Sequence, residues 1–167
     1  MAAFSGRFAL RPLSPKDERL VFGWRNDPFI VKRSSSQRQV SWAEHRRWFK
    51  SMLSSTRHLV LIATIGDAPV GQVRFDRARG GACVISVYLI ESCTGRRIGV
   101  RAIAMGCKVI RGRWPVREIR AYVRSENTAG QSAFLRAGFL RHASGTPPDH
   151  FGYRLHVTPL VQRETWS

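Results

Sequence analysis

One stretch near the middle of the chain, residues 82–109, constrains the fold more than any other. It opens with Ala82 to Ile90, an apolar and β-branched run that suits a strand buried on both faces. Glu91 to Gly95 is a short polar connection. Apolar residues then recur at helical spacing, at Ile98, Ala102, Met105 and Val109. The sequence therefore predicts a strand, a tight connection and a helix in direct succession.

The start of this helix is predicted to bind an anion. The first N–H groups of a helix have no partner within it, and the helix dipole adds partial positive charge at that end. Arg96, Arg97 and Arg101 bring full charges to the same place. We expect the pocket to hold the pyrophosphate of a coenzyme; the alternative is that these arginines form an ordinary solvated surface.

The length and composition fit one globular domain. The chain has 167 residues, of which 43% are hydrophobic, enough for a proper core. No apolar run approaches the ~20 residues that cross a bilayer, and the first residues lack the charged-then-apolar order of a signal peptide. We expect a single domain over residues 1–167, located in the cytoplasm and not associated with a membrane.

The chain is strongly basic, with 28 Lys and Arg against 11 Asp and Glu and a net charge of +17. Such a charge is compatible with nucleic acid, phosphorylated ligands or acidic surfaces. The arginines are spread along the chain and no nucleic-acid-binding motif accompanies them, so a nucleic-acid partner is not expected. A biased surface composition without function is the competing explanation.

The cysteines predict neither a metal site nor a catalytic thiol. Cys83, Cys93 and Cys107 are not in metal-ligand spacing, so no metal is expected. Cys83 and Cys107 lie on apolar faces, whereas Cys93 lies in the connecting loop, where solvent could reach it. No His stands near Cys93 in the sequence to activate it as a nucleophile.

The segments around the central stretch predict an α+β domain. Residues 59–65 and 70–76 have strand patterns, and the turns Gly66-Asp67 and Gly80-Gly81 join them to the strand at 82–90 in an antiparallel meander. Upstream we expect a strand over 8–12, a helix between Ser14 and Asp27-Pro28, and a helix capped by Ser41 and Glu44 that buries His45, Trp48, Phe49, Met52 and Leu53. Downstream we expect a strand over 119–124, a helix from Asn127 to Gly138, and a final strand pair within 139–157.

Two segments resemble the GNAT (GCN5-related N-acetyltransferase) superfamily. The first is Thr94-Gly95-Arg96-Arg97-Ile98-Gly99, which is similar to the family's Gln/Arg-x-x-Gly-x-Gly/Ala turn; it departs from the pattern at Thr94 and Arg97. The second is residues 127–139, NTAGQSAFLRAGF, which matches the family's Asn, helix and Gly-Phe ending. The resemblance implies the GNAT acyl-CoA N-acyltransferase fold, a mixed and mostly antiparallel sheet flanked by helices. It also implies acetyl-CoA as co-substrate and direct attack by an amine.

A narrower resemblance involves the N-terminal third. Residues 24–28, WRNDP, followed by residues 41–48 with Glu44-His45, are similar to acetyltransferases of the RimJ/RimL type, and closer still to the amino-sugar acetyltransferases of pseudaminic-acid synthesis. This resemblance places four residues around the acceptor: Trp24, Arg25, Asn26 and His45. An aromatic and arginine lining suits a nucleotide-linked amino sugar, because a ring can stack and a guanidinium can meet phosphate.

The family resemblance also implies a coenzyme site. The strand backbone near the end of the central strand would pair with the pantetheine arm, the helix start would clasp the pyrophosphate, and the second segment would flank the arm. The residues so assigned are Leu89, Ile90, Gly95, Arg96, Arg97, Ile98, Gly99, Val100, Asn127 and Phe134. A plain helix cap is an equal alternative for Asn127.

The proton donor and acceptor of the reaction are less defined by the sequence. Many family members place a tyrosine where this chain has Phe134, which has no proton to give. Tyr88 and Tyr153 are candidate donors to the leaving thiolate, and we assign Tyr88. Glu91, Asp76, His45 or a water chain could accept the proton of the amine, and we assign Glu91.

The sequence thus favours an N-acetyltransferase acting on a primary amine of a small molecule, with a nucleotide-linked amino sugar as one candidate. An acetyltransferase for protein N-termini, such as those of ribosomal proteins, and a non-catalytic acyl-CoA-binding module are the alternatives. The expected assembly is a monomer or a homodimer.

Overall fold

Seven strands form one sheet, with the order β1-β2-β3-β4-β5-β7-β6, in a computed structural model that describes residues 4–158. The strands are β1 (Phe8–Pro12), β2 (His58–Ile65), β3 (Ala68–Arg77), β4 (Ala82–Leu89), β5 (Glu118–Arg124), β6 (Leu140–His142) and β7 (His150–His156). All neighbouring pairs are antiparallel except β4 and β5, which are parallel. The predicted meander and the mixed, mostly antiparallel sheet are confirmed.

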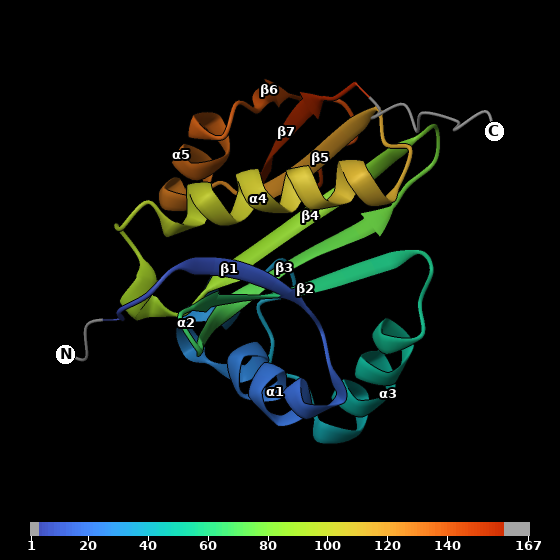
Figure 1. Ribbon diagram of the computed structural model, residues 1–167. Coiled ribbons are helices and arrows are strands. Elements are labelled where there is room, and N and C mark those ends of the chain that lie inside the picture. The colour runs from blue at the N-terminus through green and yellow to red at the C-terminus, as the bar shows by residue number, and fades with distance from the viewer. Residues whose placement is uncertain (1–3, 159–167) are drawn as a thin grey trace.

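Helices cover both faces of this sheet (Figure 1). They are α1 (Glu18–Asn26), α2 (Pro28–Arg33), α3 (Trp42–Leu53), α4 (Ile98–Arg113) and α5 (Thr128–Arg136), with short 3-10 turns η1 (Pro15–Asp17) and η2 (Glu91–Cys93). Helices α4 and α5 pack on one face and α1 to α3 on the other (Figure 1). The sheet therefore has a core on each side, as a mixed sheet buried by helices requires.

The helix α2 was not predicted. The Asp27-Pro28 pair ends α1, as expected, but it also starts α2, because the Asp27 carboxylate accepts hydrogen bonds from the N–H groups of Phe29 (2.8 Å) and Ile30 (3.3 Å). Proline at the first helical position suits this role, since its missing N–H is not needed there. The same dipeptide thus turns the chain from one helix directly into the next.

An ion pair joins the first strand to the first helix. Arg11 of β1 donates two hydrogen bonds to the Asp17 carboxylate, at 2.7 and 2.8 Å, and Asp17 also accepts the N–H of Ser14. The Arg11 guanidinium holds the pKa of Asp17 below its usual range. The predicted helix start at Ser14 is therefore present, although its first turn is the 3-10 turn η1.

The helix α3 has the predicted capping box of Ser41 and Glu44. Its inner stripe is shorter than expected, because Leu53 is exposed at the last helical position. In α4, Ile98 and Ala102 are buried as predicted, whereas Val109 is exposed. Both residues lie at the margin of the apolar stripe of their helix. Helical spacing alone does not predict how far burial extends on either side of such a stripe.

Gly106 sets how closely α4 approaches the sheet. A Cβ at this buried position would lie 2.9 Å from Val73 Cγ1 and 3.2 Å from a ring carbon of Phe75, both fully buried in β3. In the same helix, a Cβ at Gly112 would have no neighbour within 4 Å. Substitutions at these two glycines therefore distinguish the effect of close packing from the effect of helix propensity.

We predict opposite effects for Gly106→Ala and Gly112→Ala. Alanine favours a helix over glycine by about 1 kcal/mol, so Gly112→Ala should raise the free energy of unfolding. Gly106→Ala should lower it by roughly 1–2 kcal/mol, because overpacking against β3 outweighs that gain. Urea unfolding of both variants measures the difference; a stabilised Gly106→Ala would contradict the packing of α4 described above.

Candidate active site

The strands β4 and β5 part after a short parallel pairing. Only Ala82, Cys83 and Val84 pair with β5, opposite Glu118, Ile119 and Arg120, although both strands continue beyond this point. On its other edge, β4 stays paired with β3 as far as Leu89. The second half of β4 therefore has one hydrogen-bonded edge and one edge without a strand partner. We call the region between β4 and β5 beyond Val84 the wedge.

The backbone at the end of β4 is divided between these edges. The Ile90 N–H donates to the Val70 carbonyl at 2.9 Å, so it is used within the sheet. Backbone groups of successive strand residues face alternate edges, which directs the N–H of Leu89 into the wedge. Of the two residues predicted to pair with a pantetheine arm, Leu89 has the suitable orientation and Ile90 does not.

The wedge leads to the start of α4. The connection turns sharply through two left-handed residues, Gly95 (φ 73°) and Arg97 (φ 57°). Arg97 is the N-cap of α4, yet no side chain caps the helix, so the first N–H groups of Ile98, Gly99 and Val100 remain available to a ligand. The predicted helix start is therefore present without a side-chain cap and with an arginine in a backbone conformation that favours glycine, and its binding of an anion stays a prediction.

A basic pocket lies beside this helix start. It has a volume of about 440 Å³ and is lined by Arg97, Val100, Arg101 and Arg136. Arg136, near the end of α5, was not predicted to belong to the site. It arrives there because α4 and α5 pack closely: a Cβ on Gly99 would lie 3.7 Å from Ala133 Cβ and 3.9 Å from Leu89 Cδ1. Sequence spacing gives no signal for such a contact between helices.

Two other predicted coenzyme residues have clear roles in the fold. Asn127 caps α5, because its side-chain oxygen accepts the N–H of Gly130 at 3.0 Å. Phe134 is buried between Phe139, at a ring distance of 5.1 Å, and Tyr153, at 6.1 Å. The Tyr153 hydroxyl is also buried and has no partner among the described residues.

The two predicted catalytic residues have different surroundings. The Tyr88 hydroxyl donates to the Gln72 side-chain oxygen at 3.2 Å, and its ring meets the edge of Trp24 at 6.0 Å. Burial raises the pKa of Tyr88 well above its usual value, while the charges of Arg25 and Arg74 oppose this shift. Glu91 lies exposed at the start of η2, directly after the strand.

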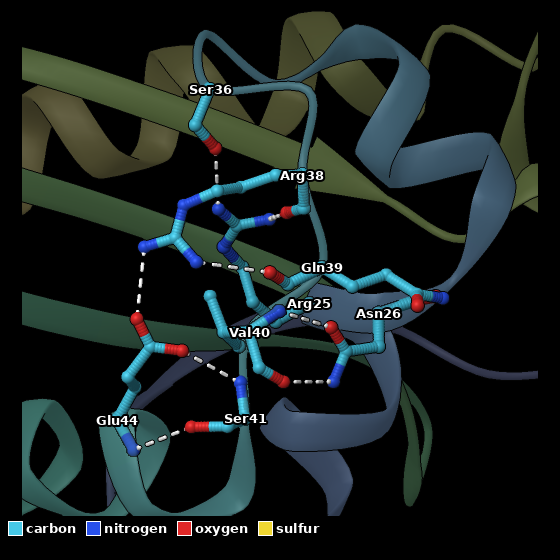
Figure 2. Close-up of polar contacts among 8 residues, drawn as sticks. All are labelled: Arg25, Asn26, Ser36, Arg38, Gln39, Val40, Ser41 and Glu44. Atoms are coloured by element: carbon cyan, nitrogen blue, oxygen red, sulfur yellow. Dashed lines mark hydrogen bonds and ion pairs between the residues drawn. The ribbon is translucent and has the colours of Figure 1, made fainter.

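Arg25 and Asn26 tie the end of α1 to the loop 34–41 (Figure 2). Arg25 donates to Ser36 Oγ at 2.7 Å and to the Arg38 carbonyl at 3.2 Å. Asn26 donates to the Val40 carbonyl and accepts the Val40 N–H, at 3.0 and 2.7 Å. Arg25 and Asn26, which were predicted to border the substrate that accepts the acetyl group, therefore hold this loop in place.

Two arginines, Arg25 and Arg74, lie near Tyr88 on this side of the sheet, and Arg38 lies near Arg25. Burial lowers the pKa of Arg25, and the neighbouring charges of Arg38 and Arg74 lower it further. Tyr88 acts in the opposite direction and raises the pKa of Arg25. Arg38 pairs with Glu44 at 3.0 Å, and Arg74 pairs with the Asp76 carboxylate. The sequence predicted Arg25 here but not Arg38 or Arg74. Arg38 comes from the loop 34–41 and Arg74 from β3, so only the fold brings them near Arg25.

His45 does not join this group. It is 2% exposed, its Nε2 lies 2.8 Å from the Glu18 carbonyl, and aromatic rings surround it. Burial and this contact make His45 a packing residue between α1 and α3, so its prediction as an acceptor residue is corrected. Cys93 is likewise buried rather than exposed, and burial raises the pKa of its thiol.

Residues 4–158 contain no cluster of three or more His, Cys, Asp or Glu side chains arranged to hold a metal ion. None of the helices in this part of the chain is long and apolar enough to cross a bilayer.

Comparison with known proteins identifies the domain. A model of the acetyltransferase (GNAT) domain family matches residues 7–140. An uncharacterized protein of Methanocaldococcus jannaschii is 22% identical over 146 residues, which are 83% of this chain. The chain spans only 29% of the length of that relative.

Solved structures share the fold at low sequence identity. Aminoglycoside acetyltransferase AAC(6')-Ib with ribostamycin and coenzyme A superposes with a TM-score of 0.80, at 17% identity, over 96% of this chain and 99% of that one. The ribosomal L7/L12 α-N-protein acetyltransferase RimL with coenzyme A gives 0.78 at 15% identity, over 93% and 97%. The N-acetyltransferase PseH of Campylobacter jejuni with acetyl coenzyme A gives 0.69 at 17% identity, over 91% and 100%.

The left-handed Arg97 gives a stability prediction. A left-handed conformation costs a residue with a side chain about 1 kcal/mol or more, whereas glycine adopts it freely. Arg97→Gly should therefore unfold with a free energy about 1 kcal/mol higher than Arg97→Ala, which keeps the strain and removes the same charge. Denaturant unfolding compares the two; equal stability, or a more stable alanine variant, would show that position 97 is not left-handed in solution.

Proposed function

The chain belongs to the GNAT acetyltransferase family, and we propose that it transfers the acetyl group of acetyl-CoA to a primary amine on an anionic small molecule. The observation that carries this proposal is the open wedge between β4 and β5, which ends at the arginine-lined start of α4. One end of the wedge suits an extended arm and the other suits phosphate groups.

The pocket at α4 would hold the pyrophosphate of the coenzyme. Arg97, Arg101 and Arg136 offer guanidinium groups that can each contact two phosphate oxygens. The N–H groups at the first turn of α4 add donors that point the same way. Arg97 stands where the family pattern has a glycine. In this proposal the phosphate contact of its guanidinium offsets the cost of its left-handed backbone.

The wedge would then hold the pantetheine arm along β4. The Leu89 N–H lies on the open edge, where it can pair with the arm or polarise the thioester carbonyl. Attack by a neutral amine forms the new C–N bond as the C–S bond breaks, so the amine loses a proton and the coenzyme thiolate gains one. No covalent enzyme intermediate is needed.

Tyr88 and Glu91 are the proposed proton donor and acceptor. Burial raises the pKa of Tyr88 and keeps its phenol protonated, so Tyr88 would assist by turning its hydroxyl from Gln72 to hydrogen-bond to the leaving thiolate. Glu91 is an exposed carboxylate directly after the strand that would carry the arm, so it can pass a proton to solvent. Phe134, in the position of the family tyrosine, has no proton to transfer.

The arginines near Tyr88 favour an acceptor with negative charge. Arg25 and Arg74 lie near Tyr88 and Arg38 lies near Arg25, and the carboxylates of Glu44 and Asp76 pair with Arg38 and Arg74. Because Arg38 and Arg74 are neutralised by these pairs, the net positive charge is that of Arg25, which suits an anionic group on the acceptor better than a polycationic aminoglycoside. Trp24 packs against Tyr88 and adds an aromatic wall, so a nucleotide-linked amino sugar is the proposed acceptor class.

The proposal places the reaction in the cytoplasm, where acetyl-CoA is formed and used. The chain would act as a monomer or a homodimer.

We predict that Arg97→Ala weakens acetyl-CoA binding by on the order of 1–3 kcal/mol, the loss of one charge-assisted hydrogen bond. The matched control is Arg79→Ala, which removes the same charge from an exposed position in the turn between β3 and β4. Calorimetric titration measures both affinities. Equal affinities in the two variants would remove Arg97 from the coenzyme site.

A second prediction concerns the acceptor. Arg25→Ala should raise the KM for a nucleotide-linked amino sugar about tenfold, roughly 1.4 kcal/mol, and leave the KM for acetyl-CoA unchanged. Ser36→Ala is the control, because it removes the shorter of the two loop contacts of Arg25 but keeps the charge. The same KM increase in both variants would mean that Arg25 acts by holding the loop and not by binding the acceptor.

The proposed function is tested by measuring thiol release from acetyl-CoA with three acceptors: a nucleotide-linked amino sugar, an aminoglycoside and a peptide with a free N-terminus. The highest kcat/KM should belong to the amino sugar. Preference for the peptide would favour N-terminal protein acetylation, and coenzyme binding without thiol release would favour a non-catalytic module.

A further inference from the structure

A second basic hollow lies at the opposite end of α4. It has a volume of about 240 Å³, and its lining comes from the turn before β2, the start of β2, the end of β3 and the end of α4. The lining residues are Ser55, Thr56, His58, Arg77, Arg113 and Trp114. None of these was assigned a role by the sequence, and none belongs to the proposed acetyl-transfer site.

The two basic hollows are well separated. Arg97 and Arg101 line the first at the N-terminal end of α4, and Arg113 lines the second at its last residue. A helix of 16 residues is about 24 Å long, at roughly 1.5 Å per residue. One coenzyme pyrophosphate cannot occupy both places.

Positive charge converges on the second hollow without a carboxylate in its lining. Arg77 and Arg113 both reach it, and neither pairs with an acid within residues 4–158. The nearest acid in the strand, Asp76, already pairs with Arg74 and His58. Like charges held together are unfavourable unless an anion lies between them.

The His58 ring at the edge of the hollow is held in place by Asp76. Its Nδ1 lies 2.6 Å from the Asp76 carboxylate, which can only accept, so Nδ1 carries a proton. The other ring nitrogen, Nε2, accepts hydrogen bonds in the neutral ring, so His58 serves here as a fixed wall of the hollow and is not counted as a donor. Asp76 thus acts on His58 as a second-layer carboxylate acts on a ligand-binding histidine, by fixing the ring orientation.

The remaining lining residues add donors and rigidity. Ser55 Oγ accepts the N–H groups of Arg57 and His58, both at 3.0 Å, so its own proton stays available to a ligand. The Arg77 guanidinium stacks over Trp114 at 4.6 Å, and Trp114 is buried, which holds the guanidinium in place. The Arg77 guanidinium and the Ser55 hydroxyl are therefore oriented by contacts within the protein, while Arg113 lies exposed at the end of α4.

We propose that this hollow binds the phosphate group of a small ligand, separately from the acetyl-transfer site. Guanidinium groups of Arg77 and Arg113 and the Ser55 hydroxyl supply several donors in one hollow, the pattern that a phosphate with several acceptor oxygens needs. The negative end of the α4 dipole lies nearby, and Arg111 and Arg113 in its last turn offset it. Free phosphate and a nucleoside monophosphate share this chemistry.

The test follows the indole N–H signal of Trp114 by NMR while inorganic phosphate replaces chloride at constant ionic strength. Trp114→Phe identifies the signal. In the wild-type chain a saturable shift is expected, and Arg113→Ala should weaken it about tenfold, as loss of one charge-assisted hydrogen bond does. Arg79→Ala, with the same change of net charge, and Arg97→Ala, in the first basic pocket, should leave the affinity unchanged.

A parallel titration with AMP separates the two sources of phosphate. Equal affinity for AMP and inorganic phosphate would identify the phosphate group alone as the ligand, and tighter AMP binding would identify a nucleotide. Absence of a saturable shift in the wild-type chain would overturn the proposal. Equal weakening by Arg113→Ala and Arg79→Ala would also overturn it, because the binding would then follow net charge alone.

Discussion

The parting of β4 and β5 is the constraint on which the rest of the molecule depends. A parallel pair needs a crossover connection, and here α4 supplies it on one face of the sheet. Gly106 lets α4 lie close to β3, so the helix is held against the meander rather than between the parting strands. The strands pair for three residues and then separate, which leaves backbone N–H groups of β4 open to a ligand. Sheet edges are normally covered or paired, so an unpaired inner edge favours a bound chain.

Much of the positive charge of the protein lies in a few places around the sheet and α4. The α4 and α5 side has an arginine pocket at the start of α4, where the coenzyme phosphates would bind, and a second hollow at its end. The α1 to α3 side has Arg25 and Arg74 close to Tyr88, with Arg38 near Arg25, where the acceptor would bind. The net charge of +17 therefore includes three local concentrations of arginine, each suited to an oxyanion.

Local patterns predicted most elements of the fold, because their causes are local. Alternating apolar residues predicted the β2 to β4 meander, and the Ser41 and Glu44 box predicted the start of α3. The site depended on contacts between distant residues, which spacing does not encode. Arg136 joins the basic pocket only because α5 packs on α4, and His45 is lost from the acceptor side because its ring is buried under α1. The sequence showed that Arg97 departs from the family pattern, but it did not predict the left-handed backbone of this residue.

The central claim is that acetyl-CoA lies along the open edge of β4 with its phosphates at the start of α4. Amide hydrogen exchange of β4, measured with and without acetyl-CoA, tests it most directly. The account predicts that the coenzyme slows exchange of the Leu89 N–H, which faces the wedge, and leaves the Ile90 N–H unchanged, since that group already donates to Val70. Saturating acetyl-CoA without any slowing at Leu89 would contradict the account and place the coenzyme elsewhere on the molecule.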